Sequence, residues 1–83
     1  MSGMVTDKEF DWFVLQVGMR IGYYRRRAGM TQEALAEKTG YAKSHIGQIE
    51  SPNIVCNVSL KALYKIAKVL GVTVSKLTNI EDD

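Results

Sequence analysis

Apolar residues recur at steps of three and four positions along most of the chain, which is the spacing of one face of an α-helix. The first such stretch covers residues 7–27, and its predicted core stripe is Phe10, Phe13, Val14, Val17, Ile21 and Tyr24. Thr6 and Glu9 match a capping box, and Gly29 can form a C-terminal cap. The pattern therefore predicts one long first helix that begins at Asp7.

Two shorter helices follow, at 32–39 and 43–50, joined by a tight turn at Gly40. Thr31 caps the first of them, but Ala42 stands where a capping Ser or Thr is expected before the second. One small core is expected to bury Leu35, Ala36, Tyr41, Ile46 and Ile49. This layout is that of a helix-turn-helix, in which the second helix enters the DNA major groove.

Residues 51–58 contain the only proline and are predicted to form a loop. Ser59 caps a fourth helix over 60–70, and Thr73 caps a short fifth helix over 74–78. The stripe of the fourth helix is predicted to be Leu60, Leu63, Ile66, Ala67 and Leu70. In the fifth helix Leu77 is expected to turn inward, and the polar tail after it is expected to fray. The expected fold is all-α.

The chain has 83 residues, which predicts a single domain over 1–83 near the lower size limit for one hydrophobic core. One cysteine, Cys56, excludes an intrachain disulfide, and no Cys/His cluster has metal-ligand spacing, so no metal or other cofactor is expected. Acidic residues interrupt the N-terminus, and there is no long apolar run, so neither a signal peptide nor a membrane span is expected. A reducing, cytoplasmic setting fits this composition.

The charge is unevenly distributed along the chain. The overall net charge is only +2, but residues 17–76 hold ten Lys and Arg against three Glu, a net charge of +7. The other six acidic residues lie near the two ends. A basic body with acidic ends fits a polyanionic partner, although an ordinary solvated surface is an alternative.

Several residues together resemble a known family. They are Arg25, Gly29, Thr31-Gln32, Leu35-Ala36, Gly40, Ile46, Gln48-Ile49-Glu50 and the run from Leu60 to Val72. With these residues the chain resembles the Cro/C1-type (XRE, phage-repressor-like) helix-turn-helix family over a core of about 17–78. The resemblance implies a compact five-helix lambda-repressor-like DNA-binding domain, here with an extended first helix at 4–16. It also implies an ion pair between Arg25 and Glu50, which would hold the recognition helix on the scaffold.

Three residues of the helix at 43–50 are expected to read bases. Lys43 can donate to guanine O6 and N7, Ser44 to several base edges, and Gln48 can pair bidentately with adenine. A pure phosphate contact is an open alternative for Lys43.

Other polar residues are candidates for contacts with the DNA backbone. They are Gln32, Gly47, His45, Arg26, Arg27, Ser51 and Asn53. The alternatives are a plain exposed position for Gln32, a packing role for His45, and simple solvation for Arg26 and Arg27. Because the loop at 51–58 is about two residues longer than the commonest family form, its contacts are the least defined.

Homodimerisation is expected, because one recognition helix contacts too few bases for strong specificity. One candidate surface comprises Val74, Leu77, Ile80, Ile54 and Val55. The other is a second stripe on the first helix, formed by Trp12, Leu15, Met19 and Tyr23, unless Trp12 folds against the C-terminal helices. The C-terminal surface is favoured, and Cys56 fits a small apolar loop residue better than an interchain disulfide.

The predicted function is a sequence-specific double-stranded DNA-binding transcriptional regulator, a repressor that binds a palindromic operator as a homodimer. The alternative is an antitoxin-like or other protein-interaction module with a heteromeric partner on the extended first helix. An enzyme is not expected, because His45 and Cys56 lie in different segments and no nucleophile–base set or glycine-rich phosphate loop is present.

Overall fold

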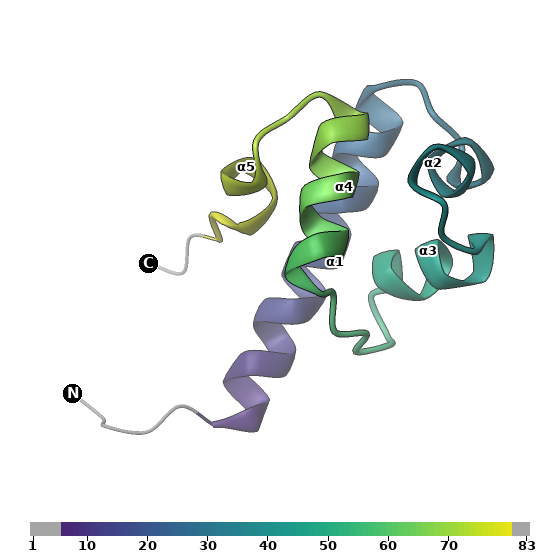
Figure 1. Cartoon of the computed structure of the whole chain (residues 1–83). Helices are drawn as coiled ribbons and strands as arrows, with labels where there is room; N and C mark the ends of the chain where they lie inside the picture. Colours follow the sequence, from purple (N-terminus) through teal and green to yellow (C-terminus); the bar gives the residue numbers. More distant parts are fainter. Residues whose placement is uncertain (1–5, 81–83) are drawn as a thin grey trace.

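The computed structural model describes residues 6–80, which form five α-helices and no strands (Figure 1). The helices are α1 (Asp7–Arg27), α2 (Gln32–Thr39), α3 (Lys43–Glu50), α4 (Leu60–Leu70) and α5 (Val74–Thr78). Each predicted helix is present at its predicted bounds, so the all-α, five-helix expectation is confirmed. Residues 4 and 5 of the expected extension, and the tail from residue 81, lie outside the described residues.

Most helices begin at a side chain that caps their first turn. At α1 the Thr6 hydroxyl accepts from the Glu9 backbone N–H, and the Glu9 carboxylate accepts from the Thr6 backbone N–H, both at 3.0 Å. At α2, α4 and α5 the preceding hydroxyl likewise accepts a backbone hydrogen bond from the first turn. The helix α3 is the exception, because Ala42 offers no side-chain acceptor. Its start therefore lacks one favourable contact that the other four helices have.

The turn between α2 and α3 depends on Gly40, whose φ of 83° lies in the left-handed region. A glycine adopts this conformation without the Cβ clash that other residues meet. The Gly40 N–H donates to the Ala36 carbonyl at 2.8 Å and thereby closes α2. The chain then reverses within two residues, so α2 and α3 pack against each other.

The core lies where α1 meets the other helices. Its most buried members are Val17, Ile21, Leu35, Ile46, Ile49, Ile66, Ala67 and Leu77. The helix α3 contacts α1 and α2, while α5 contacts α1 and α4 on the other side of the molecule (Figure 1). Tyr41 and Leu63 are only partly buried at its edge. None of the helices within 6–80 has the length and apolar content that a membrane span requires.

Three residues of the predicted core stripes are exposed instead. Phe10 is 46% exposed and Phe13 is 37% exposed, because the N-terminal half of α1 extends beyond the helices that pack on its other half (Figure 1). Leu60 is 77% exposed, because it is the first residue of α4 and lies at the end of the helix. The periodicity identified their helical face correctly, but no element covers that face at these positions.

Candidate nucleic-acid interface

One side of α3 presents polar side chains to solvent. Lys43, Ser44 and Gln48 are all exposed, and Ser44 and Gln48 lie one helical turn apart on the same face. On the opposite face Ile46 and Ile49 are buried in the core, with exposed fractions of 0% and 3%. The buried face fixes the rotation of α3 about its axis and therefore decides which side chains a DNA groove would meet.

The C-terminal end of α3 packs unusually close to α1. A Cβ added to Gly18 would lie 1.9 Å from the Ile49 carbonyl oxygen, and one added to Gly22 would lie 3.1 Å from Glu50 Oε1. The C-terminal end of α3 therefore packs directly against these two glycines. Neither glycine is among the residues predicted from the sequence to matter, although two glycines four residues apart inside a helix are a signal, since each costs about 1 kcal/mol of helix stability.

Arg25 and Glu50 form a bidentate ion pair at this junction. Arg25 Nε donates to Glu50 Oε2 at 2.7 Å, and Nη2 donates to Oε1 at 2.9 Å. The remaining guanidinium nitrogen, Nη1, donates to the Met30 carbonyl at 2.7 Å. The two side chains are only 11% and 6% exposed. The pair thus joins α1, the turn after it and the end of α3 through charge-assisted bonds.

The hydrogen bond to Glu50 raises the pKa of the Arg25 guanidinium above its ordinary value, while burial acts in the opposite direction. The raised pKa means that the folded state favours charged Arg25. That contribution to stability is complete below the pKa that Arg25 has when unfolded and would be lost only as the pH rises through the folded value. Around neutral pH the arginine is therefore charged, as the ion pair requires.

Gln32, which was expected to contact phosphate, makes a side-chain hydrogen bond within the protein. Its side-chain Nε2 donates to Glu50 Oε1 at 3.1 Å, which ties the start of α2 to the same ion pair. The amide has a second hydrogen to offer a phosphate, and the backbone N–H lies at the start of a helix, where anions are favoured. Gly47 lies under this side chain, because an added Cβ would be 3.7 Å from Gln32 Oε1.

His45 is partly buried and packs edge-on against Tyr41, with 5.5 Å between the ring centroids. Lys65 Nζ lies 5.3 Å from the centre of the same tyrosine ring. This arrangement corresponds to the packing alternative for His45. Within residues 6–80, no three His, Cys, Asp or Glu side chains come together as metal ligands would.

The remaining phosphate candidates lie at the surface around this junction. Arg26 and Arg27 are exposed, and Arg27 Nη1 donates to the Tyr23 hydroxyl at 3.1 Å. In the loop after α3, the Ser51 hydroxyl accepts from the Asn53 backbone N–H at 3.2 Å. Ser51 is partly buried and Asn53 is exposed. Arg27 also lines a hollow with Leu70, Val72 and Lys76, whereas Ser51 and Asn53 follow α3. These candidates therefore do not form one cluster.

The two candidate dimer surfaces differ in what they expose. Leu77 is 0% exposed, which confirms that it turns inward, so its assignment to the C-terminal dimer surface is wrong. The reason is that α5 is a single short turn that packs against both α1 and α4. Arg20, for which the sequence predicted no role, reinforces this packing by donating from Nε to the Lys76 carbonyl at 2.8 Å.

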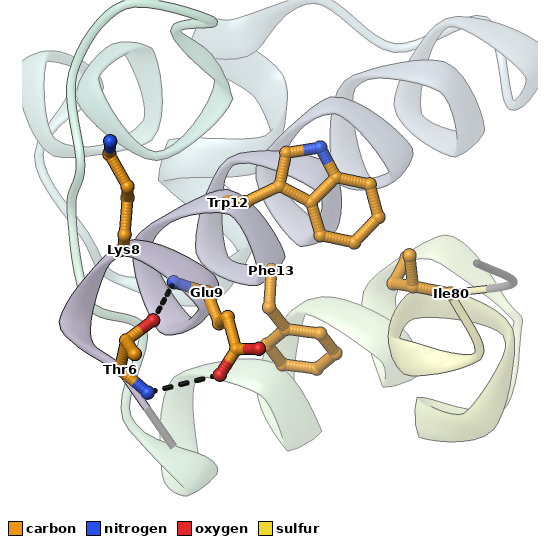
Figure 2. A pocket seen from close by; sticks show the side chains of 6 residues that line it. All are labelled: Thr6, Lys8, Glu9, Trp12, Phe13 and Ile80. Carbon is orange, nitrogen blue, oxygen red and sulfur yellow. Dashed lines mark hydrogen bonds between the residues drawn. The ribbon is translucent and has the colours of Figure 1, made fainter. Parts of the chain in front are cut away.

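The other members of both surfaces are more accessible. Ile54 and Val55 are 49% and 44% exposed, while Val74 and Ile80 are partly buried. On α1, Trp12, Met19 and Tyr23 are 46%, 40% and 49% exposed, and Leu15 is partly buried. Trp12, Phe13 and Ile80 line an open hollow of about 570 Å³. Figure 2 shows the two aromatic side chains on α1, with Ile80 across from them.

The chain is similar to known helix-turn-helix proteins. A family model described as Helix-turn-helix matches residues 21–77. The HTH-type transcriptional regulator SinR of Bacillus licheniformis is 42% identical over 67 residues, covering 81% of this chain and 60% of SinR. The chain thus spans about 60% of the length of that curated relative.

Two solved structures are similar over most of the chain. A crystal structure of SinR, the master regulator for biofilm formation, in complex with DNA gives a TM-score of 0.68 at 43% identity, covering 74% of this chain and 95% of that one. A SinR protein/SinI protein complex gives a TM-score of 0.67 at 43% identity, covering 74% of this chain and 58% of the other. The family match includes α2, α3 and both partners of the buried ion pair.

Proposed function

The chain belongs to the Cro/C1-type (XRE) helix-turn-helix family of transcriptional regulators, and we propose that it is a sequence-specific repressor that binds double-stranded DNA in the cytoplasm. The observation that carries the proposal is the build of α3. One face is locked into the core, while Lys43, Ser44 and Gln48 stand exposed on the rest. A helix held in this way can enter the major groove with a defined set of side chains.

The roles of the three exposed residues follow from their donors and acceptors. Lys43 offers an ammonium group to guanine O6 and N7, and Gln48 offers a donor and an acceptor that match the major-groove edge of adenine. Ser44, at the start of the helix, reaches either kind of base edge. Gln32, Gly47 and the basic surface around them provide the contacts to phosphate that fix the position of α3.

A homodimer on a palindromic operator completes the proposal. Three base-reading side chains specify only a few base pairs, whereas two copies related by a twofold axis double the site. The recognition helices would then contact half-sites roughly 34 Å apart, one turn of B-DNA. SinR, a similar regulator, has been crystallised in complex with DNA, which supports duplex DNA as the ligand.

Selection of bound sequences from random duplex DNA tests this function. We expect an enriched palindrome, and an affinity for it that falls steeply with salt because phosphate contacts release counterions. The Gln48→Ala variant should lose preference at a specific base position, while Tyr64→Ala on α4 serves as an exposed control with an unchanged site. Binding without any enriched sequence, or no binding at low salt, would contradict the proposal.

The second candidate function is a protein-interaction module with a heteromeric partner on α1. It is favoured by the exposed aromatic side chains of the N-terminal half of α1, and the SinR protein/SinI protein complex shows that a similar chain forms a heteromer. A stable partner recovered with the wild-type chain but not with Trp12→Ala, together with no salt-dependent affinity for DNA, would support this function over DNA binding.

A further inference from the structure

The outer side of α4 carries positive charge alone. Its charged side chains are those of Lys61, Lys65 and Lys68, called here the basic face of α4. They lie away from Ile66 and Leu70, which turn the other side of the helix into the core. Lys61 and Lys68 are exposed and Lys65 is partly buried. Residues 51–80 contain no Asp or Glu, so no acidic residue of the same segment offsets these charges.

The spacing of the three lysines is unfavourable for the helix itself. Lys61 and Lys65 are four positions apart, and Lys65 and Lys68 are three apart, so their side chains are neighbours on the helix surface. Like charges at these spacings repel each other and destabilise a helix. A polyanion bound on this side would remove the repulsion, because each ammonium group would then face a negative charge.

The acidic residues of the neighbouring helix α2 do not neutralise this face. Glu33 and Glu37 are both exposed, and they lie opposite Leu35, which belongs to the core that α2 shares with α4. Within residues 6–80 the one ion pair is that of Arg25 with Glu50. Neither glutamate of α2 is therefore paired with a lysine of α4.

One edge of the basic face adjoins the helix-turn-helix. Lys65 Nζ lies over the ring of Tyr41, in the turn between α2 and α3, at 5.3 Å from the ring centre. The same ring packs edge-on against His45. His45 directly follows Ser44, one of the residues proposed to read bases. A single aromatic ring thus separates the Lys65 ammonium group from the recognition helix.

We propose that the basic face of α4 contacts the phosphate backbone of the DNA that α3 reads. The inference rests on the proposed function, because it adds contacts to the same complex. Duplex DNA carries one negative charge per about 1.7 Å of helix axis, so phosphates border any groove that α3 enters. The three lysines extend over about 10 Å of α4, which lets them meet more than one phosphate. Such contacts fix the position of α3 and carry no sequence information.

The salt dependence of binding tests this contact. Fluorescence anisotropy measures the affinity for the selected duplex at several salt concentrations, and the slope of log affinity against log salt reports the phosphates neutralised. Lys65→Ala should reduce the slope by about 1, and replacement of all three lysines by alanine should reduce it by about 2–3, with the same enriched sequence. Circular dichroism verifies folding.

The control for net charge is Lys8→Ala. It removes one positive charge from the first turn of α1, in the half of the helix that extends beyond the other helices, and should leave the slope unchanged (Figure 1). An unchanged slope in the triple variant, or an equal reduction in Lys8→Ala, overturns the proposal.

Neutral phosphate analogues locate the contact. Methylphosphonates replace the phosphates of the selected duplex one at a time. We expect at least one position where the replacement weakens binding by the wild type but not by Lys65→Ala, because the charge that meets this phosphate is already absent. Lys65→Arg, which keeps the charge, should stay sensitive there. If the wild type binds the duplex but no such position exists, only the role of α4 is overturned. If the wild type does not bind duplex DNA, the proposed function is overturned as well.

Discussion

The two ends of α3 are built in opposite ways. At the C-terminal end Glu50 is held by Arg25 and Gln32, and the backbone at Ile49 lies directly on Gly18. At the N-terminal end Ala42 gives no capping bond, and the first residues of the helix are exposed. Contacts within the protein hold the C-terminal end, whereas the N-terminal end is exposed and can meet a ligand.

This difference shows how a small domain separates folding from recognition. The residues that hold α3 are buried or bonded within the chain, so changing them should alter stability. The three residues proposed to read bases, Lys43, Ser44 and Gln48, are exposed, so changing them should alter binding and leave stability nearly unchanged. Five substitutions test this contrast.

Glu50→Ala should have the largest effect, because it leaves the Arg25 charge buried without its carboxylate. We expect a loss of about 3 kcal/mol in the free energy of unfolding, the lower end of the range for breaking a buried pair, since both side chains keep some exposure. Urea denaturation measures it. Glu37→Ala, at an exposed position of α2, is the control and should change stability by no more than about 0.5 kcal/mol. Equal stability of the two variants would show that the pair does not anchor α3.

Gly18→Ala should come next, because its methyl group would meet the Ile49 carbonyl oxygen and push α3 away from α1. Overpacking of this kind lowers the free energy of unfolding by about 1–3 kcal/mol. The better helix propensity of alanine offsets about 1 kcal/mol of that loss. The matched control is Gly47→Ala, whose added methyl group makes an ordinary contact. Thermal unfolding should therefore place Gly18→Ala below the wild type and Gly47→Ala at or above it. The reverse order would show that α3 is not seated on Gly18.

Lys43→Ala and Gln48→Ala should each weaken binding to the selected DNA site by about 1–2 kcal/mol, because each removes a contact to a base edge. Their unfolding free energies should stay within about 0.5 kcal/mol of the wild type, as expected for exposed positions. Fluorescence anisotropy at a fixed salt concentration and urea denaturation measure the two quantities separately. If either variant binds normally, its residue does not read bases.

Ala42→Ser should have the smallest effect, and it should stabilise the protein. Ala42 has φ −69° and ψ 146°, the extended conformation in which a serine hydroxyl can accept from the first turn of α3. We expect a gain of about 1 kcal/mol, which raises the melting temperature by roughly 4–8 °C in a domain of this size. Ala42→Val, which cannot cap, is the control. No gain over valine would mean that the start of α3 is not limited by its missing cap.

The helix bounds could be predicted closely because they depend on neighbours in the sequence. Thr6 with Glu9, and Gly40 in its left-handed turn, act within four residues of themselves. The candidate site was predictable in part. The family resemblance indicated the pairing of Arg25 with Glu50, but the bond from Gln32 to Glu50 depends on how α2 and α3 meet in space.

The sequence by itself therefore determined the five helices, the apolar face of each and the polar side chains carried by α3. Only the tertiary structure decided that Phe10, Phe13 and Leu60 stay exposed and that α3 closes onto Gly18. The physical reason is that a helix begins and ends through local hydrogen bonds. Burial, in contrast, requires a second element opposite the side chain, and the position of that element is a property of the whole fold.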